Sequence, residues 1–403
     1  MKIFGIRINK ELIPSMVVAF YVIIPTLNLI IVHIQPSLEG AIMSLLYGIG
    51  GGAAVLTAIF CKKVRISASF WVILATIIIA YILTPDFGSD KVLTTPYFIM
   101  FTLVPFIIPQ FIGVDARIVA LFAMIVPSFG VFFPVQLFVL NSMGMIQMDL
   151  SYSLLVPIVS TFIYLFLYWK NDSILIRIFV FPFVICNIVY LVYVALFGSR
   201  APVMSALLCA AFLFIFQPPK NKMGFVANSK RMKIVGVTFI VFIISFFTIA
   251  ALLEGMLDKY GIEAGALEKI SRLQGEGDLS NGHWEVSSLS FKGYLESPLW
   301  GHGLSSSPKV TGQVHPHNFI IQFLFDGGII FALIIILPMV RHLTHWSKKC
   351  NFNDFAIITM MFFSSVIGAF FSLDVWMNAR LWLFFGFLFS NKMFFNYYKF
   401  RRL

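Results

Sequence analysis

The sequence predicts an all-α protein that crosses a membrane many times. Of its 403 residues, 59% are hydrophobic and only 12% are charged, whereas soluble domains carry about 25% charged residues. Apolar stretches long enough to cross roughly 30 Å of hydrocarbon recur along the whole chain. Basic residues gather in the short segments between alternate stretches, an asymmetry that is typical of multi-pass membrane proteins.

We expect about twelve membrane-spanning helices. The first follows the basic segment MKIFGIRINK. Because its apolar run is longer than that of a cleaved signal peptide, we expect it to be an uncleaved helix. The predicted spans cover residues 12–34, 39–61, 67–84, 96–113, 118–141, 150–169, 174–197, 201–217, 234–253, 317–340, 355–373 and 380–398.

The distribution of charge predicts that both termini are cytoplasmic. If the chain starts inside, 21 of its 29 Lys and Arg residues fall on that side, which the positive-inside rule assigns to the cytoplasm. The net charge of +11 is scattered in short clusters and forms no continuous phosphate-binding face, so we predict no nucleic-acid partner. The eight basic residues left on the outer side are Lys91, Arg200, Lys259, Lys269, Arg272, Lys292, Lys309 and Arg380.

These spans divide the chain into three regions. Residues 1–253 hold the first nine helices, residues 254–316 form one large outer loop, and residues 317–403 hold the last three helices. Within the loop, SNGHWEVSSLSFKGYLE has the pattern of a helix. Because long loops in compact proteins are usually functional, we expect this loop to contribute to a site.

Residues at the outer ends of three spans indicate a site for an anion. Arg200 lies between the seventh and eighth spans, His317 starts the tenth, and Arg380 starts the twelfth. The planar donor fork of arginine suits phosphate oxygens, and histidine exchanges a proton near neutral pH. We therefore predict an outward-facing site for a membrane-embedded phosphate or diphosphate ester. For each arginine, the alternative is a side chain that extends to lipid headgroups.

Two neighbouring features have competing interpretations. His315 and His317 flank a proline and could share a metal only in an extended geometry, and no carboxylate cluster follows them, so we predict no metal site. Asp326 lies roughly 13 Å deeper if the helix is regular. An ionisable group at that depth is a functional candidate, but Asp326-Gly327-Gly328 is equally compatible with a helix break whose acid faces a cavity.

Four segments within residues 190–390 form a recognisable series. They are GSRAPVMSALL, with an arginine at an outer span start; SNGHWEVSSLSFKGYLESPLWGHGL, a loop that ends in proline and glycine; HPHNFIIQFLFDGGII, a His-Asn motif followed by a glycine pair; and NARLW, with the last outer arginine. In this order the segments resemble the bacterial O-antigen ligase and O-antigen polymerase superfamily, and the first half of the chain is similar in hydropathy alone.

The resemblance implies a metal-independent, cofactor-free glycosyltransferase of the large helical inner-membrane type (GT-C-like), with its site and large loop in the periplasm. The donor would be a glycan on undecaprenyl diphosphate. A polymerase passes it to the non-reducing end of another lipid-linked repeat unit, whereas a ligase passes it to lipid A core. The implied partners are the lipid-linked donor and acceptor, the bilayer, and a chain-length regulator as a further candidate.

A flippase or transporter of lipid-linked oligosaccharides is the alternative of a different class. It would favour ionisable residues spread through a central cavity. Here all of the candidate residues except Asp326 lie in loops or at outer helix ends. The sequence therefore favours an enzyme.

Residue by residue, the resemblance assigns diphosphate-site roles to Arg200 and His317, with Arg380 as a weaker third. Guanidinium groups would stabilise the growing charge of the leaving diphosphate. His317 would accept the proton of the incoming hydroxyl, with Glu285 as the reserve base. The remaining substrate-binding candidates are Arg272, His283, His315 and Asn318.

Two departures from the family pattern bear on the acceptor. His283 stands where the ligase pattern has a second essential arginine, and Phe331 replaces a further glycine after the glycine pair. Arg272 is a candidate substitute for the missing arginine. The loss of that arginine favours a polymerase over a ligase.

Overall fold

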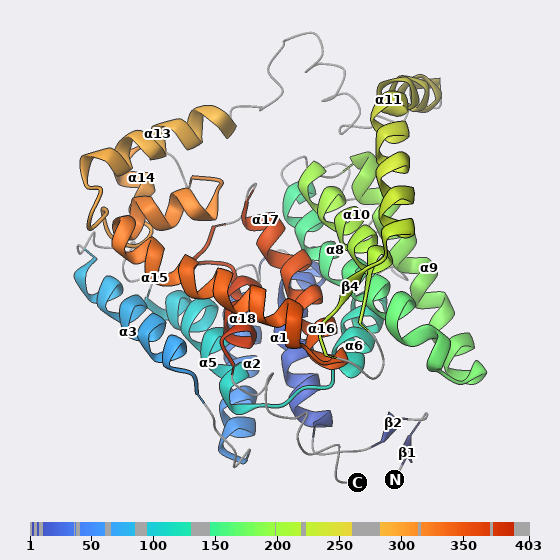
Figure 1. Ribbon diagram of the computed structural model, residues 1–403, viewed down its shortest axis with the longest axis horizontal. Helices are drawn as coiled ribbons and strands as arrows, with labels where there is room; N and C mark the ends of the chain where they lie inside the picture. Colours follow the sequence, from blue (N-terminus) through green and yellow to red (C-terminus); the bar gives the residue numbers. More distant parts are fainter. Residues whose placement is uncertain are drawn as a thin grey trace.

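The computed structural model shows a bundle of α-helices (Figure 1). The structure describes residues 2–3, 6–7, 11–35, 37, 41–60, 66–84, 95–129, 146–197, 199–218, 223–259, 283–312, 316–370 and 374–390. Its helices are α1 (Leu12–Ile34), α2 (Ala41–Phe60), α3 (Ala68–Leu83), α5 (Val104–Phe111), α6 (Ala116–Ser128), α8 (Ile146–Ile163), α9 (Ile174–Phe197), α10 (Arg200–Ile215), α11 (Ser229–Lys259), α13 (His283–Glu296), α14 (Ser307–Val310), α15 (Phe319–Lys349), α16 (Phe352–Met361), α17 (Ile367–Ala369) and α18 (Ala379–Leu388).

Short irregular turns and strands complete the described part. Wider helical turns lie next to α5, α8 and α16, at Ile99–Leu103, Tyr164–Tyr168 and Phe362–Val366, and a tight turn covers Trp169–Asn171. Two antiparallel pairs of two-residue strands are present: β1 (Lys2–Ile3) with β2 (Ile6–Arg7), and β3 (Phe216–Gln217) with β4 (Val226–Ala227).

Helices occupy all twelve predicted positions, wherever those positions fall within the described residues. Six of them, in the described part, are long and apolar enough to cross a membrane: Leu12–Val32, Ala41–Phe60, Leu150–Asn171, Ile174–Leu196, Phe319–Lys349 and Phe352–Ala369. The chain is therefore an all-α protein of the multi-pass membrane class. The count of twelve spans stays a prediction.

Several predicted helix ends differ from the structure. We expected the twelfth span to reach residue 398, but α18 ends at Leu388. We expected the tenth span to end at residue 340, but α15 continues to Lys349, and the ninth continues to Lys259 instead of residue 253. Both extensions include charged residues that follow an apolar run. Once a helix is nucleated, each added residue gains a hydrogen bond, so a helix does not have to stop where its apolar run stops.

The outer surface of the bundle is apolar, as a bilayer requires. On α2, Ile59 and Phe60 are 68% and 79% exposed, and Leu175 on α9 is 75% exposed. In water such surfaces would mark association or aggregation sites. In a bilayer they contact lipid, while the helices satisfy their own backbone hydrogen bonds.

α18 lies at the centre of the bundle. All ten of its residues, Ala379–Leu388, are buried, and it packs against α5, α15 and α16. Trp382 stacks against Trp376 with ring centroids 5.5 Å apart and meets Phe106 edge-on. A helix that is apolar on all sides is expected in such a position. Arg380 is the exception in this helix.

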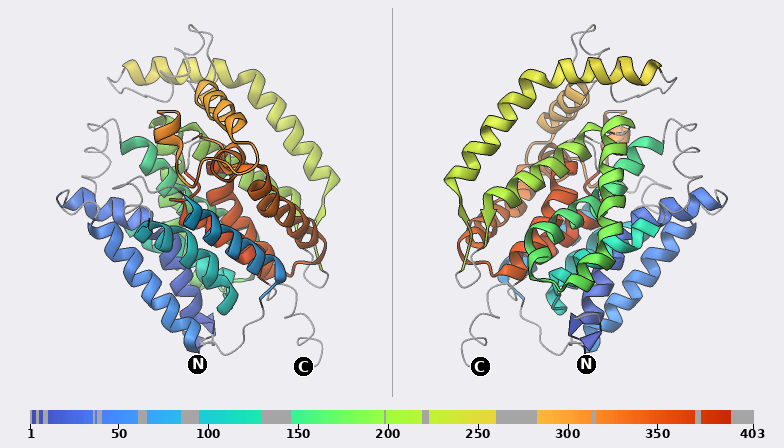
Figure 2. Two further views of the ribbon diagram at one scale, coloured as in Figure 1. Left: turned by 90° about the vertical axis from the view of Figure 1, so that its left-hand side faces the viewer. Right: turned by 90° about the vertical axis from the view of Figure 1, so that its right-hand side faces the viewer.

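The bundle has two distinct ends (Figure 2). The strands β1 and β2 lie near one end, and α13 lies at the other. The hairpin β3–β4 packs against the last turn of α15, since Gly224 donates its N–H to the carbonyl of Cys350 (2.9 Å). The start of α15 lies beside α13, where Ser287 donates to the carbonyl of Pro316 (3.1 Å). We call the second end the α13 end.

Candidate functional site

Arg200 and Arg380 approach one turn of α8 from two different helices at the α13 end. Arg200 is the first residue of α10, and the preceding Ser199 donates its N–H to Oγ of Ser151 (3.1 Å). Arg380 is the second residue of α18, and its Nη1 donates to the carbonyl of Tyr152 (2.9 Å). Because Ser151 and Tyr152 are adjacent in α8, the backbone that leads into Arg200 and the side chain of Arg380 contact the same turn.

Arg380 is a buried cation. Its exposed fraction is 5%, and the phenols of Tyr47 and Tyr152 are its electrostatic neighbours. Between the residues that the structure describes, one ion pair is present, that of Arg117 with Asp172, and Arg380 takes no part in it. A buried charge costs several kcal/mol when nothing compensates it. An anion bound beside Arg380 would offset this cost.

His317 lies immediately before α15, in a strained backbone conformation. Its φ is 54°, and the left-handed region costs a residue with a Cβ roughly 1–2 kcal/mol. The next residue, Asn318, caps the helix, because its Oδ1 accepts the N–H groups of Ile320 (3.0 Å) and Ile321 (3.3 Å). Strain of this kind is frequent at functional sites, where the surrounding structure maintains it.

The loop helix α13 lies next to His317. Ser287 in its first half donates to the carbonyl of Pro316, directly before His317 (3.1 Å). Residues two apart on a helix do not share a face, so Glu285 projects away from Pro316, and it is exposed. His317 is half-buried. Of the two candidate bases, His317 is therefore the one enclosed by the surrounding helices.

Two hydrogen bonds hold the first half of α15 against the turn that precedes α18. Oε1 of Gln322 accepts the N–H of Val375 (3.1 Å). Nε1 of Trp376 donates to Oδ2 of Asp326 (2.5 Å). Arg380 follows Trp376 by four residues, so the helix that begins after His317 and the helix that carries Arg380 are fastened to each other.

The helix break predicted at Asp326-Gly327-Gly328 is confirmed, and the side chain of Asp326 is packed against Trp376. Gly328 has φ 72° and ψ −177°, which interrupts α15. A break of this kind leaves backbone groups without partners inside the helix. The preceding loop supplies these partners: His302 and Gly303 donate to the carbonyls of Phe325 and Asp326 (both 2.9 Å), and Ile329 donates to the carbonyl of Pro298 (2.8 Å).

The close approach of loop and helix explains the glycines and the buried acid. A Cβ added to Gly328 would lie 2.2 Å from the carbonyl oxygen of Leu299. Asp326 is 1% exposed, accepts a hydrogen bond from Trp376 and lies beside the backbone of Ser305 and Ser306. Asp326 therefore joins the loop, α15 and the turn before α18.

Three predicted site residues cannot be placed. Arg272 and His315 lie outside the described residues, and the same holds for the side chain of His283, whose backbone begins α13. Their substrate-binding roles stay predictions.

Sequence reasoning missed the aromatic partners of the polar site residues. Tyr47 and Tyr152 surround Arg380, and Trp376 binds Asp326. In the sequence, these aromatic residues are marked only by a polar group on the ring, which lies within an apolar span or close to one. The partners are far apart in the chain: Trp376 lies 50 positions after Asp326, and Arg380 lies 333 positions after Tyr47.

Comparison with known families supports the resemblance seen in the sequence. Residues 185–336 match a family model described as O-antigen ligase. The matched segment contains Arg200, Glu285, His317 and Asn318 and ends before Arg380. Comparisons with curated proteins and with solved structures give no match. The match supports the O-antigen ligase and polymerase superfamily and, with the apolar helices, a membrane protein of lipopolysaccharide biosynthesis.

Proposed function

We propose that this protein is an O-antigen polymerase. It transfers a glycan from undecaprenyl diphosphate to the non-reducing end of another lipid-linked repeat unit, and it releases undecaprenyl diphosphate. The family match over residues 185–336 supports polymerase or ligase chemistry. The structural observation that carries the proposal is the buried Arg380, whose guanidinium contacts the turn of α8 that also binds Ser199, the residue directly before Arg200.

The two arginines would bind the diphosphate of the donor. As the bond to the anomeric carbon breaks, negative charge grows on the leaving oxygen, and preorganised guanidinium donors stabilise it. In this proposal Arg200 and Arg380 supply the positive charge, so no metal ion takes part. Arg200 is exposed and can meet a substrate that arrives from the bilayer or from outside.

His317 would act as the general base. The acceptor hydroxyl must lose its proton as it attacks the anomeric carbon, and a neutral imidazole can take that proton. Its place between α13 and α15 supports this role, because loop residues there can position an acceptor sugar. Glu285 is the second candidate base, and Asn318, His315, His283 and Arg272 are proposed to contact the sugars.

The acceptor distinguishes a polymerase from a ligase. His283 in place of the family's second loop arginine supports the polymerase. The ligase, which uses lipid A core as its acceptor, is the alternative. A lipid-linked oligosaccharide flippase is less well supported, because Arg200 and His317 lie at helix starts at the α13 end, outside a central pathway.

We further propose that the α13 end faces the periplasm and that both termini are cytoplasmic, in the inner membrane. Two exposed valines test this orientation. Val310 is 40% exposed and precedes the start of α15, and Val226 is 75% exposed and lies beside its last turn. In a background without native cysteines, V310C should react with a membrane-impermeant maleimide in spheroplasts, and V226C only after lysis. Labelling of V226C in intact spheroplasts would contradict this orientation.

Deletion of the gene tests the choice of acceptor. We expect cells that carry a single repeat unit on lipid A core, because a separate ligase still transfers unpolymerised repeats. Plasmid-borne parent sequence should restore long chains, and the length distribution on gels reports both outcomes. Bare core together with accumulated lipid-linked polymer would instead assign this protein as the ligase.

A further inference from the structure

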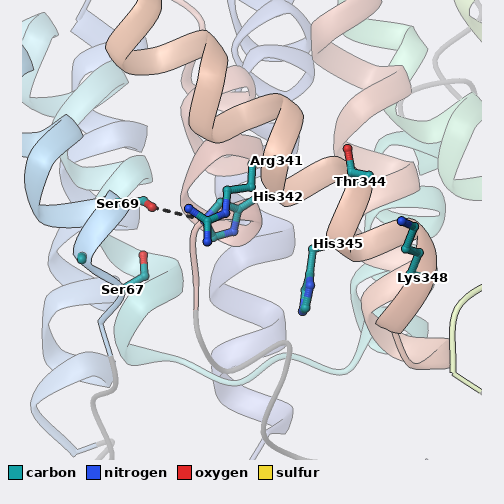
Figure 3. A pocket seen from close by; sticks show the side chains of 8 residues that line it. Ser67, Ser69, Arg341, His342, Thr344, His345 and Lys348 are labelled. Atoms are coloured by element: carbon teal, nitrogen blue, oxygen red, sulfur yellow. Dashed lines mark hydrogen bonds between the residues drawn. The ribbon is translucent and has the colours of Figure 1, made fainter.

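A basic pocket lies at the end of α15 opposite His317 (Figure 3). It has a volume of about 700 Å³ and lies between the first turn of α3 and the last turns of α15. Helix α15 separates it from the candidate active site, since the part after the break at Gly328 alone spans roughly 21 Å to His342 at 1.5 Å per residue. The lining residues are Ser67, Ala68, Ser69, Arg341, His342, Thr344, His345 and Lys348.

The pocket concentrates positive charge on one helix face. The cations Arg341 and Lys348 are seven residues apart and lie along the same side of α15, with the imidazole of His345 between them. The described residues that line the pocket include no Asp or Glu, and neither Arg341 nor Lys348 takes part in an ion pair within the described part of the chain. The cations of this pocket therefore retain their capacity to bind an anion.

The opposite wall is the start of α3, where hydroxyl and imidazole groups meet. Ser67 caps this helix: its Oγ accepts the N–H of Phe70 (3.1 Å) and donates to the carbonyl of Phe389 (2.8 Å). Nε2 of His342 lies 3.3 Å from Oγ of Ser69, and Arg341 and His342 extend toward that serine (Figure 3). The positive end of the α3 dipole adds to the charge of the two helical cations.

The pocket borders the lipid-facing surface of the bundle. Leu337, one turn before Arg341, is 61% exposed, and Val340, one turn before Thr344, is 52% exposed. On α3, Trp71 is 56% exposed beside the first turn. Tryptophan favours the boundary between headgroups and hydrocarbon. A phosphate in the pocket would therefore have apolar surface beside it that can contact an acyl chain.

We propose that this pocket binds a phosphate group on the side of the membrane opposite the candidate active site. The ligand is an anionic phospholipid headgroup or a soluble phosphate compound, held by Arg341 and Lys348 with Ser69, His342 and His345 as further polar contacts. Arginine provides a paired donor fork, lysine a point charge, and both are common at phosphate sites. Basic pockets between membrane helices recognise lipid headgroups in the same way.

Binding to the variant R341Q/K348Q tests the pocket. Both side chains are exposed, so their removal leaves the core intact, and thermal unfolding of the purified protein should be unchanged in phosphatidylcholine nanodiscs. Native mass spectrometry would then measure phosphatidylglycerol bound to each protein in detergent, with phosphatidylcholine as the neutral probe. We expect about 25-fold weaker phosphatidylglycerol binding, about fivefold for each cation. R341K/K348R should keep most of the affinity.

The control variant K292Q/K309Q removes two exposed cations at the α13 end and should bind phosphatidylglycerol like the parent. Inorganic phosphate identifies the source of the ligand. If it displaces the lipid, the pocket serves soluble phosphate compounds, and if it does not, the acyl chain contributes and the ligand is a lipid. Equal phosphatidylglycerol binding by the parent and R341Q/K348Q, or equal parent binding of both lipids, would overturn the proposal.

Discussion

Replacing Arg200 by alanine is expected to lower kcat/KM for glycan transfer by about 10²- to 10³-fold, the loss seen when one preorganised charge-stabilising donor is removed. The reason is that, in the proposed site, Arg200 and Arg380 together bind the diphosphate beside one turn of α8, which the start of α10 and the side chain of Arg380 both contact. Arg200→Lys should lose less, because lysine keeps the charge but not the planar fork. The rate of glycan transfer per folded molecule measures the effect.

A matched control and a double variant sharpen this test. Lys309 is another exposed cation at the α13 end, and Lys309→Ala should keep the parent rate. Arg380→Gln keeps a donor near the carbonyl of Tyr152 and removes the buried charge. If both arginines bind one diphosphate, the losses for Arg200→Ala and Arg380→Gln should not be additive. Parent-like kcat/KM for Arg200→Ala would exclude Arg200 from the site.

Replacing His317 by alanine is expected to slow turnover by about 10²- to 10⁴-fold, the usual contribution of a general base. The base must be neutral to accept a proton. The parent rate should therefore fall at acidic pH, where an imidazole carries its second proton and cannot accept another. His317→Ala should lose this acidic decline along with most of the rate. Turnover measured from pH 5 to 9, about 2 units on each side of neutrality, would show both effects.

A purely structural His317 predicts a different pattern. The residue holds a strained φ of 54° before the cap of α15, so its loss could change stability instead of chemistry. In that case His317→Ala would show altered thermal unfolding, near-parent turnover per folded molecule and an unchanged pH profile. This result would leave Glu285 as the base, and Glu285→Gln would then carry the loss of activity.

Hydropathy was sufficient to locate the helices, because burial in lipid imposes the same apolar composition on each of them. Hydropathy could not predict where α11 and α15 end, because both helices continue into polar residues that give no apolar signal. The break at Gly328 could be suspected from Asp326-Gly327-Gly328. Its stabilisation by the loop at His302 and Gly303 depends on backbone contacts that no local pattern contains.

For the candidate site too, the sequence could predict the residues but not their arrangement in space. Arg200, His317 and Arg380 could be selected from the sequence, because each is a polar residue at the start of an apolar helix. Their arrangement depends on α8, whose Tyr152 lies 228 positions from Arg380 in the chain. Single-sequence reasoning has no signal for a contact of that separation, and so it could not show that the start of α10 and the side chain of Arg380 contact one turn of α8.

The most direct test of the proposed activity uses purified protein in bilayer nanodiscs with a single undecaprenyl-diphosphate-linked repeat unit as both donor and acceptor. A polymerase should convert it to a ladder of lipid-linked glycans that differ by one repeat, with release of undecaprenyl diphosphate for each step. Arg200→Ala and His317→Ala should form this ladder far more slowly. Transfer only when lipid A core is added would contradict the polymerase and favour the ligase, and no transfer to either acceptor would contradict the glycosyltransferase proposal itself.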